Sequence, residues 1–416
     1  MTLLSMKQHC AAAALSLSLA ALATGCDSAT TSPFTPAPAS GLAVVGGDFT
    51  STVVSLVAAD GTLAKDDCID SGTSGGTISM ALSGDVTLPS QPQRGGELWL
   101  VDRGNANLTV LAPTTCAVRA QVSVATGFKS NPHDVAVLSA TKAYVTRYET
   151  NATAADAMSK GDDIVVIDPA TGTITSRIDL APEATAVTGK TIQARPDRLV
   201  IAGGKVYVSL GNQDAMFTAA ADGRVVIIDP ATDMIAGHVD LTGLKGCSAL
   251  SHLEATNTLL VACGGSFADA DQAAGSGIAE IDLSVSPPVL ARTTKAAKLG
   301  GQALNFSWVA ASSATRAFAG TMGTFPPMGS TDPGTNDETH VFDPAAGTST
   351  KLSVTAGAFD LGRAAFGEGK LFVPDATFNK PLIHVLTVPA TGDVTVASTF
   401  DPDPAKGLPP REIAWY

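Results

Sequence analysis

Short apolar runs separated by polar turn residues fill this chain from about residue 42 to its end. The clearest examples are DDIVVIDPATGTITSRIDL at 162–180 and GRVVIIDPATDMIAGHVDL at 223–241. Each contains an apolar run of strand length, an Asp-Pro-Ala-Thr turn and a second run of mixed apolar and polar residues, which is typical of a β-hairpin. A hairpin this short cannot bury its own apolar face, so a chain that repeats it must stack the copies.

Related hairpins recur about every 55 residues. Seven copies are found, at 51–63, 105–122, 162–180, 223–241, 276–294, 338–354 and 381–398. A further pair of short strands precedes the hairpins, as in HDVAVL at 133–138 followed by KAYVTRYETN at 142–151. Four strands per repeat with tight turns predict the blade of a β-propeller. We therefore expect an all-β, seven-bladed propeller over 42–416, with six or eight blades as alternatives because the first two repeats are irregular.

The two ends of this region complement each other. LPPREIAWY at 408–416 matches the inner strand of a repeat, but no hairpin follows it. The first repeat begins at GLAVVGGDF, 41–49, without an inner strand. The pattern therefore predicts ring closure, in which the C-terminal strand completes the first blade and removes a free sheet edge.

The first 41 residues are expected to lie outside the propeller. Residues 1–25 have a weakly basic start and an Ala/Leu-rich run that ends in Ala-Thr-Gly before Cys26, which predicts a lipoprotein signal peptide with lipidation at Cys26. The alternative is an ordinary signal peptide, with Cys26 incidental. Residues 26–41 are rich in Ser, Thr, Pro and Ala, which predicts a flexible tether. These features predict a bacterial cell-envelope protein held on a membrane by its lipid.

Net charge and cysteine content indicate which classes of partner and which redox compartment suit this protein. The formal charge of −13 argues against a nucleic-acid partner, and solubility alone is the simplest reason for it. Six cysteines are present, of which Cys10 leaves with the signal peptide. The four others in the propeller region allow three connectivities in an oxidising compartment, and no CxxC unit suggests zinc. We favour Cys247 with Cys263, which flank a predicted hairpin, and therefore Cys68 with Cys116.

Two strands carry a recognisable motif. YVT at 144–146 and VYVS at 206–209, together with Asn212 and the IDPATG hairpins, resemble the YVTN family of seven-bladed propellers. The resemblance covers most of 42–416 and implies the fold more than any activity. Arg147 stands where the family often has Asn, which weakens a transfer of function.

Connections between the second and third strands of the repeats are long, and they are expected on one face of the propeller. Long loops on a rigid scaffold are where binding usually develops. Asp269-Ala270-Asp271 and Asp162-Asp163 offer hard oxygen ligands for calcium, but neither has the spacing of a known calcium loop. We therefore expect solvated acidic loops and no metal or other cofactor.

Polar residues at the start of the inner strands should meet on that same face, at the mouth of the central channel. The candidates are Asn131, His133, Asp134, Arg195, Asp197, Arg198, Asn305, Trp308, Asp360, Arg363, Arg411 and Glu412. A mouth ringed by Arg and His is suited to an anion or a sugar acid. The alternative is that these residues pair with one another and with backbone groups between blades.

Motifs of catalysis are absent from the sequence. It contains no GxSxG, HExxH or phosphate-binding loop. The expected function is a monomeric, non-enzymatic binding module that meets an envelope protein or a small ligand through the long-loop face. The alternative is a propeller enzyme, similar to the lactonases or the quinoprotein dehydrogenases, with its site at the channel mouth.

Overall fold

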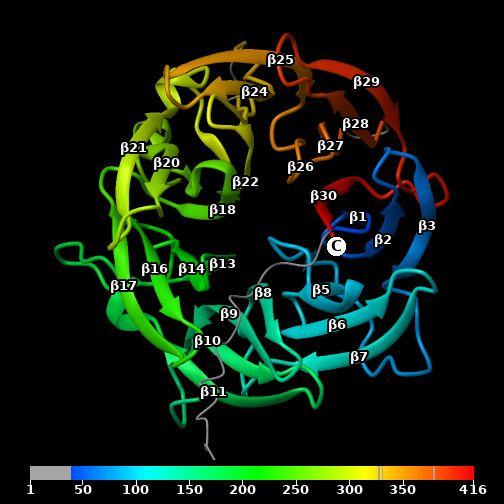
Figure 1. Ribbon diagram of the computed structural model, residues 1–416, viewed down its shortest axis with the longest axis vertical. Coiled ribbons are helices and arrows are strands. Elements are labelled where there is room, and N and C mark those ends of the chain that lie inside the picture. Colours follow the sequence, from blue (N-terminus) through cyan, green and yellow to red (C-terminus); the bar gives the residue numbers. More distant parts are fainter. Residues whose placement is uncertain (1–38, 327, 330, 378–379) are drawn as a thin grey trace, which may run out of the picture. The chain divides into compact units, whose positions relative to one another are not determined.

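Seven four-stranded antiparallel sheets stand around a central axis as the blades of a β-propeller (Figure 1). The computed structural model describes residues 39–326, 328–329, 331–377 and 380–416. The predicted all-β fold and the count of seven blades are confirmed. The predicted signal peptide, Cys26 and the tether up to residue 38 lie outside the described residues. Within the described ranges, no helix is both long and apolar enough to cross a membrane.

The C-terminal strand closes the ring, as predicted. From the axis outward, blade 1 contains β30 (Pro410–Trp415), β1 (Leu42–Gly47), β2 (Thr52–Val57) and β3 (Leu63–Asp70). Ala43 pairs with Ala414 and Val44 with Ile413 in the antiparallel ladder between β1 and β30. The inner strand of the first blade therefore comes from the far end of the chain.

The next three blades follow in chain order. Blade 2 contains β4 (Val86–Thr87), β5 (Leu98–Asp102), β6 (Asn107–Ala112) and β7 (Ala117–Ser123). Blade 3 contains β8 (Pro132–Ser139), β9 (Lys142–Thr150), β10 (Gly161–Asp168) and β11 (Thr173–Asp179). Blade 4 contains β13 (Pro196–Ala202), β14 (Lys205–Leu210), β16 (Gly223–Asp229) and β17 (Met234–Leu241), and the short strands β12 (Ile192–Gln193) and β15 (Gln213–Asp214) pair beside it.

Three further blades complete the circle. Blade 5 contains β18 (Cys247–Leu253), β19 (Thr258–Gly264), β20 (Ser276–Asp282) and β21 (Val289–Lys295). Blade 6 contains β22 (Leu304–Ser313), β23 (Arg316–Thr321), β24 (Asp337–Asp343) and β25 (Thr348–Ala356). Blade 7 contains β26 (Ala365–Gly367), β27 (Lys370–Asp375), β28 (Leu382–Thr387) and β29 (Thr395–Phe400). Short 3-10 turns are η1 (Arg94–Gly96), η2 (Ala181–Glu183), η3 (Glu254–Thr256), η4 (Gln272–Gly275) and η5 (Ala296–Lys298).

The core lies between neighbouring blades. Middle strands such as β10 are buried on both faces and have an apolar centre, Ile164–Ile167, whereas the outer strand β11 alternates between exposed and partly buried positions over most of its length. Tyr144 and Ile164 of blade 3, for example, belong to one apolar cluster with Leu199 and Val226 of blade 4. Each blade is thus stabilised by the next one, as the short repeats require.

The Asp-Pro-Ala-Thr segments are turns on the other face, as their sequence suggests. The carboxylate of Asp168 accepts the N–H of Ala170 at 2.9 Å, and Gly172 follows in the left-handed region at φ 70°. Asp229 makes the equivalent bond to the N–H of Ala231 at 3.0 Å. We call this side the short-turn face and the opposite side the long-loop face.

Both favoured disulfides are present. Cys247 and Cys263 join neighbouring strands of blade 5, where they are opposite each other in the β18–β19 ladder. Cys68, on the outer strand of blade 1, joins Cys116 in the turn between the outer strands of blade 2. The second bond therefore links two blades covalently.

Candidate functional site

The segment Leu88–Gln93 extends from blade 2 into the central channel, where it contacts blades 3, 4 and 7. We call it the strap. It continues from β4, the two-residue inner strand of blade 2, and reaches the inner strands of blades 3 and 4. The amide of Gln91 pairs with both backbone groups of Ile201, accepting its N–H at 2.8 Å and donating to its C=O at 3.2 Å. Gln93 accepts the N–H of Val137 at 2.8 Å. Two glutamine side chains thus satisfy inner-strand edges that face the axis.

Buried arginines of blades 4 and 7 also hold the strap. Arg198 of blade 4 and Arg363 of blade 7 both donate to the C=O of Leu88, at 2.9 and 2.6 Å. Glu412 lies between them, 3.6 Å from Arg198 and 3.5 Å from Arg363, and accepts the N–H of Leu88. Burial and the neighbouring Arg198 lower the pKa of Arg363 to about 10. Burial favours the neutral form of Glu412, but the two guanidinium groups outweigh it and lower the pKa of that carboxyl.

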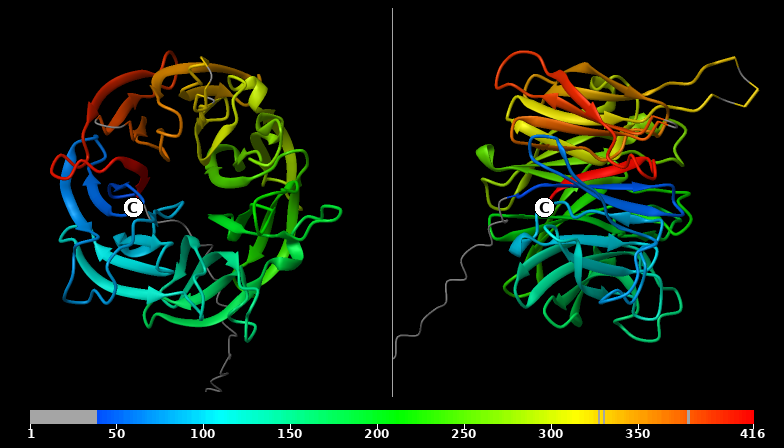
Figure 2. Two further views of the ribbon diagram at one scale, coloured as in Figure 1. Left: turned by 180° about the vertical axis from the view of Figure 1, so that it is seen from behind. Right: turned by 90° about the vertical axis from the view of Figure 1, so that its right-hand side faces the viewer.

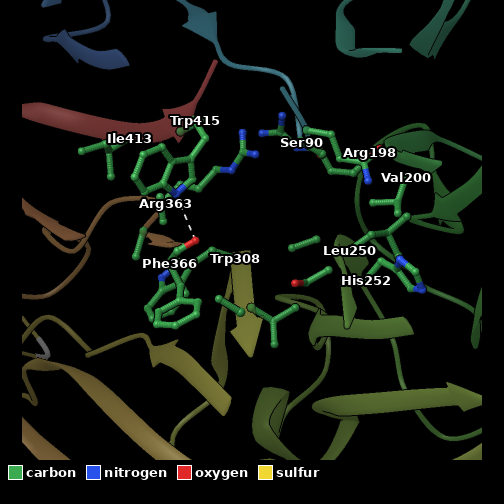
Figure 3. Close-up of a pocket in the computed structure, with 18 of the residues that line it drawn as sticks. Ser90, Arg198, Val200, Leu250, His252, Trp308, Arg363, Phe366, Ile413 and Trp415 are labelled. Atoms are coloured by element: carbon green, nitrogen blue, oxygen red, sulfur yellow. Dashed lines mark hydrogen bonds between the residues drawn. The ribbon is translucent and has the colours of Figure 1, made fainter. Parts of the chain in front are cut away.

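Below the strap, towards the short-turn face, lies a cavity of about 200 Å³. We call it the lower cavity. Figure 3 shows Ser90 of the strap above it, with Trp308, Phe366 and Trp415 along one wall. The indole N–H of Trp415 donates to the C=O of Phe366 at 3.0 Å. Trp308, which the sequence suggested for the channel mouth, lies here instead.

Above the strap, on the long-loop face, lies a larger cavity of about 360 Å³, which we call the mouth cavity. Seven of the polar residues expected at the mouth line it. His133, Asp197, Arg198, Asn305, Asp360, Arg411 and Glu412 line the mouth cavity. Arg363 lines the lower cavity and reaches the underside of the strap. The inner strands therefore do converge on the axis.

Besides Trp308 and Arg363, three of the predicted residues do not line the mouth cavity. Asp134 is fully buried, and its carboxylate accepts the N–H groups of Ser90 and Leu199 at 3.0 and 2.8 Å. Asn131 has a left-handed backbone, and its C=O accepts the N–H of Tyr148. Arg195 is also fully buried. Asp134 and Arg195 connect neighbouring blades, in agreement with the alternative that the sequence left open, whereas the contact of Asn131 lies within blade 3.

His133 and Asp197 form a pair at the wall of the mouth cavity. The imidazole Nδ1 lies 2.8 Å from Asp197 Oδ1, and the side chains are 12% and 14% exposed. Burial lowers the pKa of His133 more than Asp197 raises it. Burial acts to raise the pKa of Asp197, but His133 and Arg198 outweigh it and lower that pKa. Nε2 of His133 makes no hydrogen bond within the described ranges, so a neutral imidazole presents a free ring nitrogen beside the cavity.

A stack of planar groups supports His133. Its ring lies on that of Tyr148, with centroids 4.1 Å apart and an angle of 8°. The guanidinium of Arg195 lies 4.9 Å from the Tyr148 ring and 4.2 Å from the ring of Phe217. Arg195 also donates to the carbonyl groups of Asp214 and Ala215. Direct contacts through Arg195 and Tyr148 therefore connect the long loop of blade 4 to the His133 ring.

Most charges in the mouth cavity are paired. Its lining contains the carboxylates of Asp85, Asp197, Asp360 and Glu412 and the guanidinium groups of Arg103, Arg198 and Arg411. Arg103 Nε donates to Asp85 at 2.8 Å, and Arg198 faces Glu412. Because four carboxylates accompany three guanidinium groups, the basic mouth expected from Arg and His is neutralised. Asp85 and Arg103 were not expected from the sequence, since they lie outside the inner-strand pattern.

Apolar side chains are exposed around this mouth. Among the described residues, the largely exposed phenylalanines are Phe49, Phe217, Phe267, Phe325 and Phe359, at 43–72%. Every one of them lies in a connection on the long-loop face. The connection at 322–336, between β23 and β24, extends away from the blades (Figure 2, right) and carries Phe325 and the fully exposed Met328. Phe325 stacks on Phe359 at 5.2 Å, which joins this loop to the rim of the mouth cavity.

The acidic pairs considered for calcium have other contacts. Asp163 accepts hydrogen bonds from Arg147 and Arg177, and Asp162 accepts the N–H of Arg195. Asp269 pairs with Lys245, and Asp271 accepts the N–H of Ala274 at the start of η4. In the part of the chain that the structure describes, no three His, Cys, Asp or Glu side chains gather as metal ligands do.

The comparisons with known proteins support the fold of this chain but not a function. No protein-family model matches the sequence, and no curated protein matches it. A structure from Bacteroides uniformis ATCC 8492, provisionally named a 6-phosphogluconolactonase, is 13% identical with a TM-score of 0.54, over 91% of this chain and 100% of that one. A structure from Bacteroides fragilis NCTC 9343 with the same provisional name is 12% identical with a TM-score of 0.53, over 91% and 98%.

A third similar structure is the hydrazine synthase of Kuenenia stuttgartiensis, 13% identical with a TM-score of 0.52 over 76% of this chain and 80% of that one. At such identities the similarity shows the propeller fold alone. Membership of the YVTN family stays a prediction.

Proposed function

We propose that this protein is a binding module of the bacterial cell envelope that takes its ligand at the mouth cavity. The observation that carries the proposal is the position of that cavity. It is a hollow of about 360 Å³, lined by both charged and apolar side chains, on the same face as the long loops and the exposed phenylalanines. Ligand sites commonly have a volume of ~300–1,000 Å³ and combine apolar walls with a few convergent polar groups. The opposite face carries tight turns.

The route of the chain into the propeller supports an anchored arrangement. The N–H of Ser40 donates to the C=O of Tyr416 at 2.7 Å, next to the first pair of the β1–β30 ladder. Inner strands begin at the long-loop face, so β30 ends and β1 begins at the short-turn face. A lipid on Cys26 would therefore hold the protein from its short-turn side and leave the long-loop face accessible. Loss of detergent partitioning in Cys26→Ser tests the lipid itself.

A thermal-shift screen of the mature protein tests the binding function. A ligand that binds only the folded state raises the melting temperature by mass action. We expect a shift with at least one class of small polar compound, and we expect Asp197→Asn to diminish it because that change frees His133. A shift unchanged in Asp197→Asn places the ligand away from the His133–Asp197 pair, and no shift with any compound contradicts the proposal.

The His133–Asp197 pair favours one second candidate, a hydrolase at the same mouth. An imidazole oriented by a carboxylate, with its other nitrogen facing a cavity, is the arrangement of a general base. The test is turnover of a panel of lactones and esters. A rate that falls about 10²–10⁴-fold in His133→Ala, with the melting temperature retained, would replace the binding function by catalysis.

A further inference from the structure

Two charged side chains of the mouth cavity form no ion pair among the described residues. Arg411, on β30, donates from Nε to the C=O of Gly47 at 3.1 Å, and its guanidinium lies over the ring of Phe49 at 4.9 Å. Its two terminal nitrogens make no hydrogen bond or ion pair there. Asp360, in the connection between β25 and β26, likewise has a carboxylate that accepts no hydrogen bond and forms no ion pair. Both side chains are partly exposed, into the cavity.

Arg411 and Asp360 do not form an ion pair with each other. They influence each other electrostatically but lie beyond ion-pair distance. Burial, Asp337 and Asp375 raise the pKa of Asp360, and burial lowers the pKa of Arg411. A charge that is partly removed from water without a partner costs free energy, which a ligand of opposite charge can offset. The cavity therefore offers one unpaired positive group and one unpaired negative group.

The surroundings define the rest of the ligand. The other guanidinium groups of the lining already face carboxylates, so a second strong negative charge on a ligand would meet repulsion rather than a free cation. Beside the two unpaired groups lie Phe49, Phe359, Met322 and Leu361, which form an apolar side of the cavity. A ligand that fits carries one negative group, one positive group and a small apolar part.

We propose that the mouth cavity binds a small zwitterion of the free α-amino-acid type. Its carboxylate lies on Arg411, its ammonium group on Asp360, and its apolar side chain against Phe359 and Met322. The proposal rests on the proposed function, because it names the ligand class of the same site. A guanidinium and a carboxylate that converge without pairing satisfy both ends of such a molecule by charge-assisted hydrogen bonds. A phosphate ester would leave Asp360 unpaired.

The experiment is isothermal titration of the mature protein with matched probes. L-leucine carries both charges, N-acetyl-L-leucine lacks the ammonium group, and L-leucinamide lacks the carboxylate. D-glucose and inorganic phosphate serve as unrelated classes. We expect L-leucine to bind at least tenfold more tightly than either blocked derivative, and the two unrelated probes to bind more weakly still.

Two conservative variants assign each end of the ligand. Asp360→Asn should weaken L-leucine at least tenfold and remove its advantage over N-acetyl-L-leucine. Arg411→Gln should do the same with respect to L-leucinamide. A merely structural effect would weaken all probes alike. Arg119→Gln and Asp393→Asn, which change exposed residues on an outer strand and in a turn, are matched controls and should bind as the unchanged protein does. If Arg411→Gln lowers the melting temperature, Arg411→Lys keeps the charge and should retain part of the affinity.

Each contrary result has a distinct meaning. Equal affinity for L-leucine and its blocked derivatives, or affinity unchanged in both variants, overturns the zwitterion. Binding of glucose or phosphate that depends on Arg411, with no binding of L-leucine, overturns the zwitterion but leaves the proposed function standing. No binding by any class overturns both.

Discussion

Single carboxylates fasten the connections between blades in this protein. Asp337, fully buried at the start of β24, accepts the N–H groups of Gly323, Phe359 and Leu361 at 2.6, 3.0 and 2.8 Å. Asp162 does the same at the start of β10 for the N–H groups that lead into blade 4. These loops lie where backbone groups would otherwise be buried without partners. Aspartates that resemble metal ligands in the sequence are thus structural acceptors.

Asp337→Asn should therefore destabilise the protein. The amide offers one acceptor where the carboxylate satisfies three donors, and hydrogen bonds to a charged group are individually strong. We expect a loss of about 2–4 kcal/mol in the free energy of unfolding, measured by urea denaturation. Asp393→Asn, at an exposed turn, is the control. A loss equal to that of the control contradicts the assigned role.

His133 should make stability depend on pH. Its pKa in the folded protein lies below the ordinary value of about 6.5, because burial disfavours the charged ring. The unfolded chain takes up a proton as the pH falls through 6.5 while the folded protein does not, so stability is lost in that direction. One such group contributes at most ~1.4 kcal/mol per pH unit.

Comparison of the unchanged protein with His133→Gln isolates this contribution. Free energies of unfolding measured between pH 7.5 and 5.5 should fall less steeply in the variant. His340, whose pKa is also lowered by burial, contributes equally to both proteins. Parallel pH profiles would show that His133 takes up its proton equally in both states.

At the scale of elements, a hydroxyl at equivalent positions of two blades, Thr146 and Ser209, joins neighbouring inner strands. Thr146, in the motif that resembles the YVTN family, accepts the N–H of Asp134 at 2.9 Å and donates to the C=O of Asp197 in the next blade at 2.8 Å. Ser209 makes the same two contacts one blade further on. The motif is therefore explained by the joining of inner strands. The strap has no such repeat, because it extends from the short inner strand of blade 2 into the channel.

Gln91→Ala removes the side-chain amide that bonds to the N–H and C=O of Ile201, as the backbone of a neighbouring strand would. Ile201 would lose both partners in a channel that is only partly open to water, which costs about 1–3 kcal/mol for each unsatisfied group, or less where water enters. We expect about 2 kcal/mol of destabilisation together with faster hydrogen exchange at the N–H of Ile201. Exchange that stays as slow as in the unchanged protein would show that the amide does not protect this edge.

For the whole propeller, stability depends on ring closure. Blade 1 combines β30 with three strands from the other end of the sequence, and Trp415 packs edge-on against Phe372 of blade 7. The N–H of Ile413 also donates to the C=O of Arg363, so that blades 7 and 1 are joined along their inner strands. One nine-residue segment thus completes a sheet and closes the circle.

Deletion of 408–416 should accordingly abolish cooperative unfolding or lower the melting temperature sharply. It removes an entire inner strand, exposes the edge of β1 and eliminates Glu412 beneath Arg198 and Arg363. Deletion of the same length of exposed sequence from the loop 322–336 is the control and should leave melting nearly unchanged. A truncated protein that melts like the full chain would show that closure is dispensable.

The sequence determined what is local and repeated. Hairpins, turns, blade number and ring closure follow from periodicity, turn residues and strand spacing, because each depends on neighbours in the chain or on the repeat itself. Cys247 and Cys263 were favoured as a pair because they flank a predicted hairpin, and Cys68 with Cys116 was then the remaining pair. The polar residues at the starts of the inner strands were also correctly expected near the axis, since the repeat places them there.

Only the tertiary structure decided what those residues do. The strap interrupts the repeat, so the repeat pattern could not predict its course. For the same reason the pattern could not predict that Trp308 and Arg363 line the lower cavity rather than the mouth cavity. Pairing across the axis, as between Arg198 and Glu412, joins residues more than 200 positions apart and neutralises most of the basic mouth. Whether a charge is paired depends on distances across the ring, and these left Arg411 and Asp360 without an ion pair among the described residues.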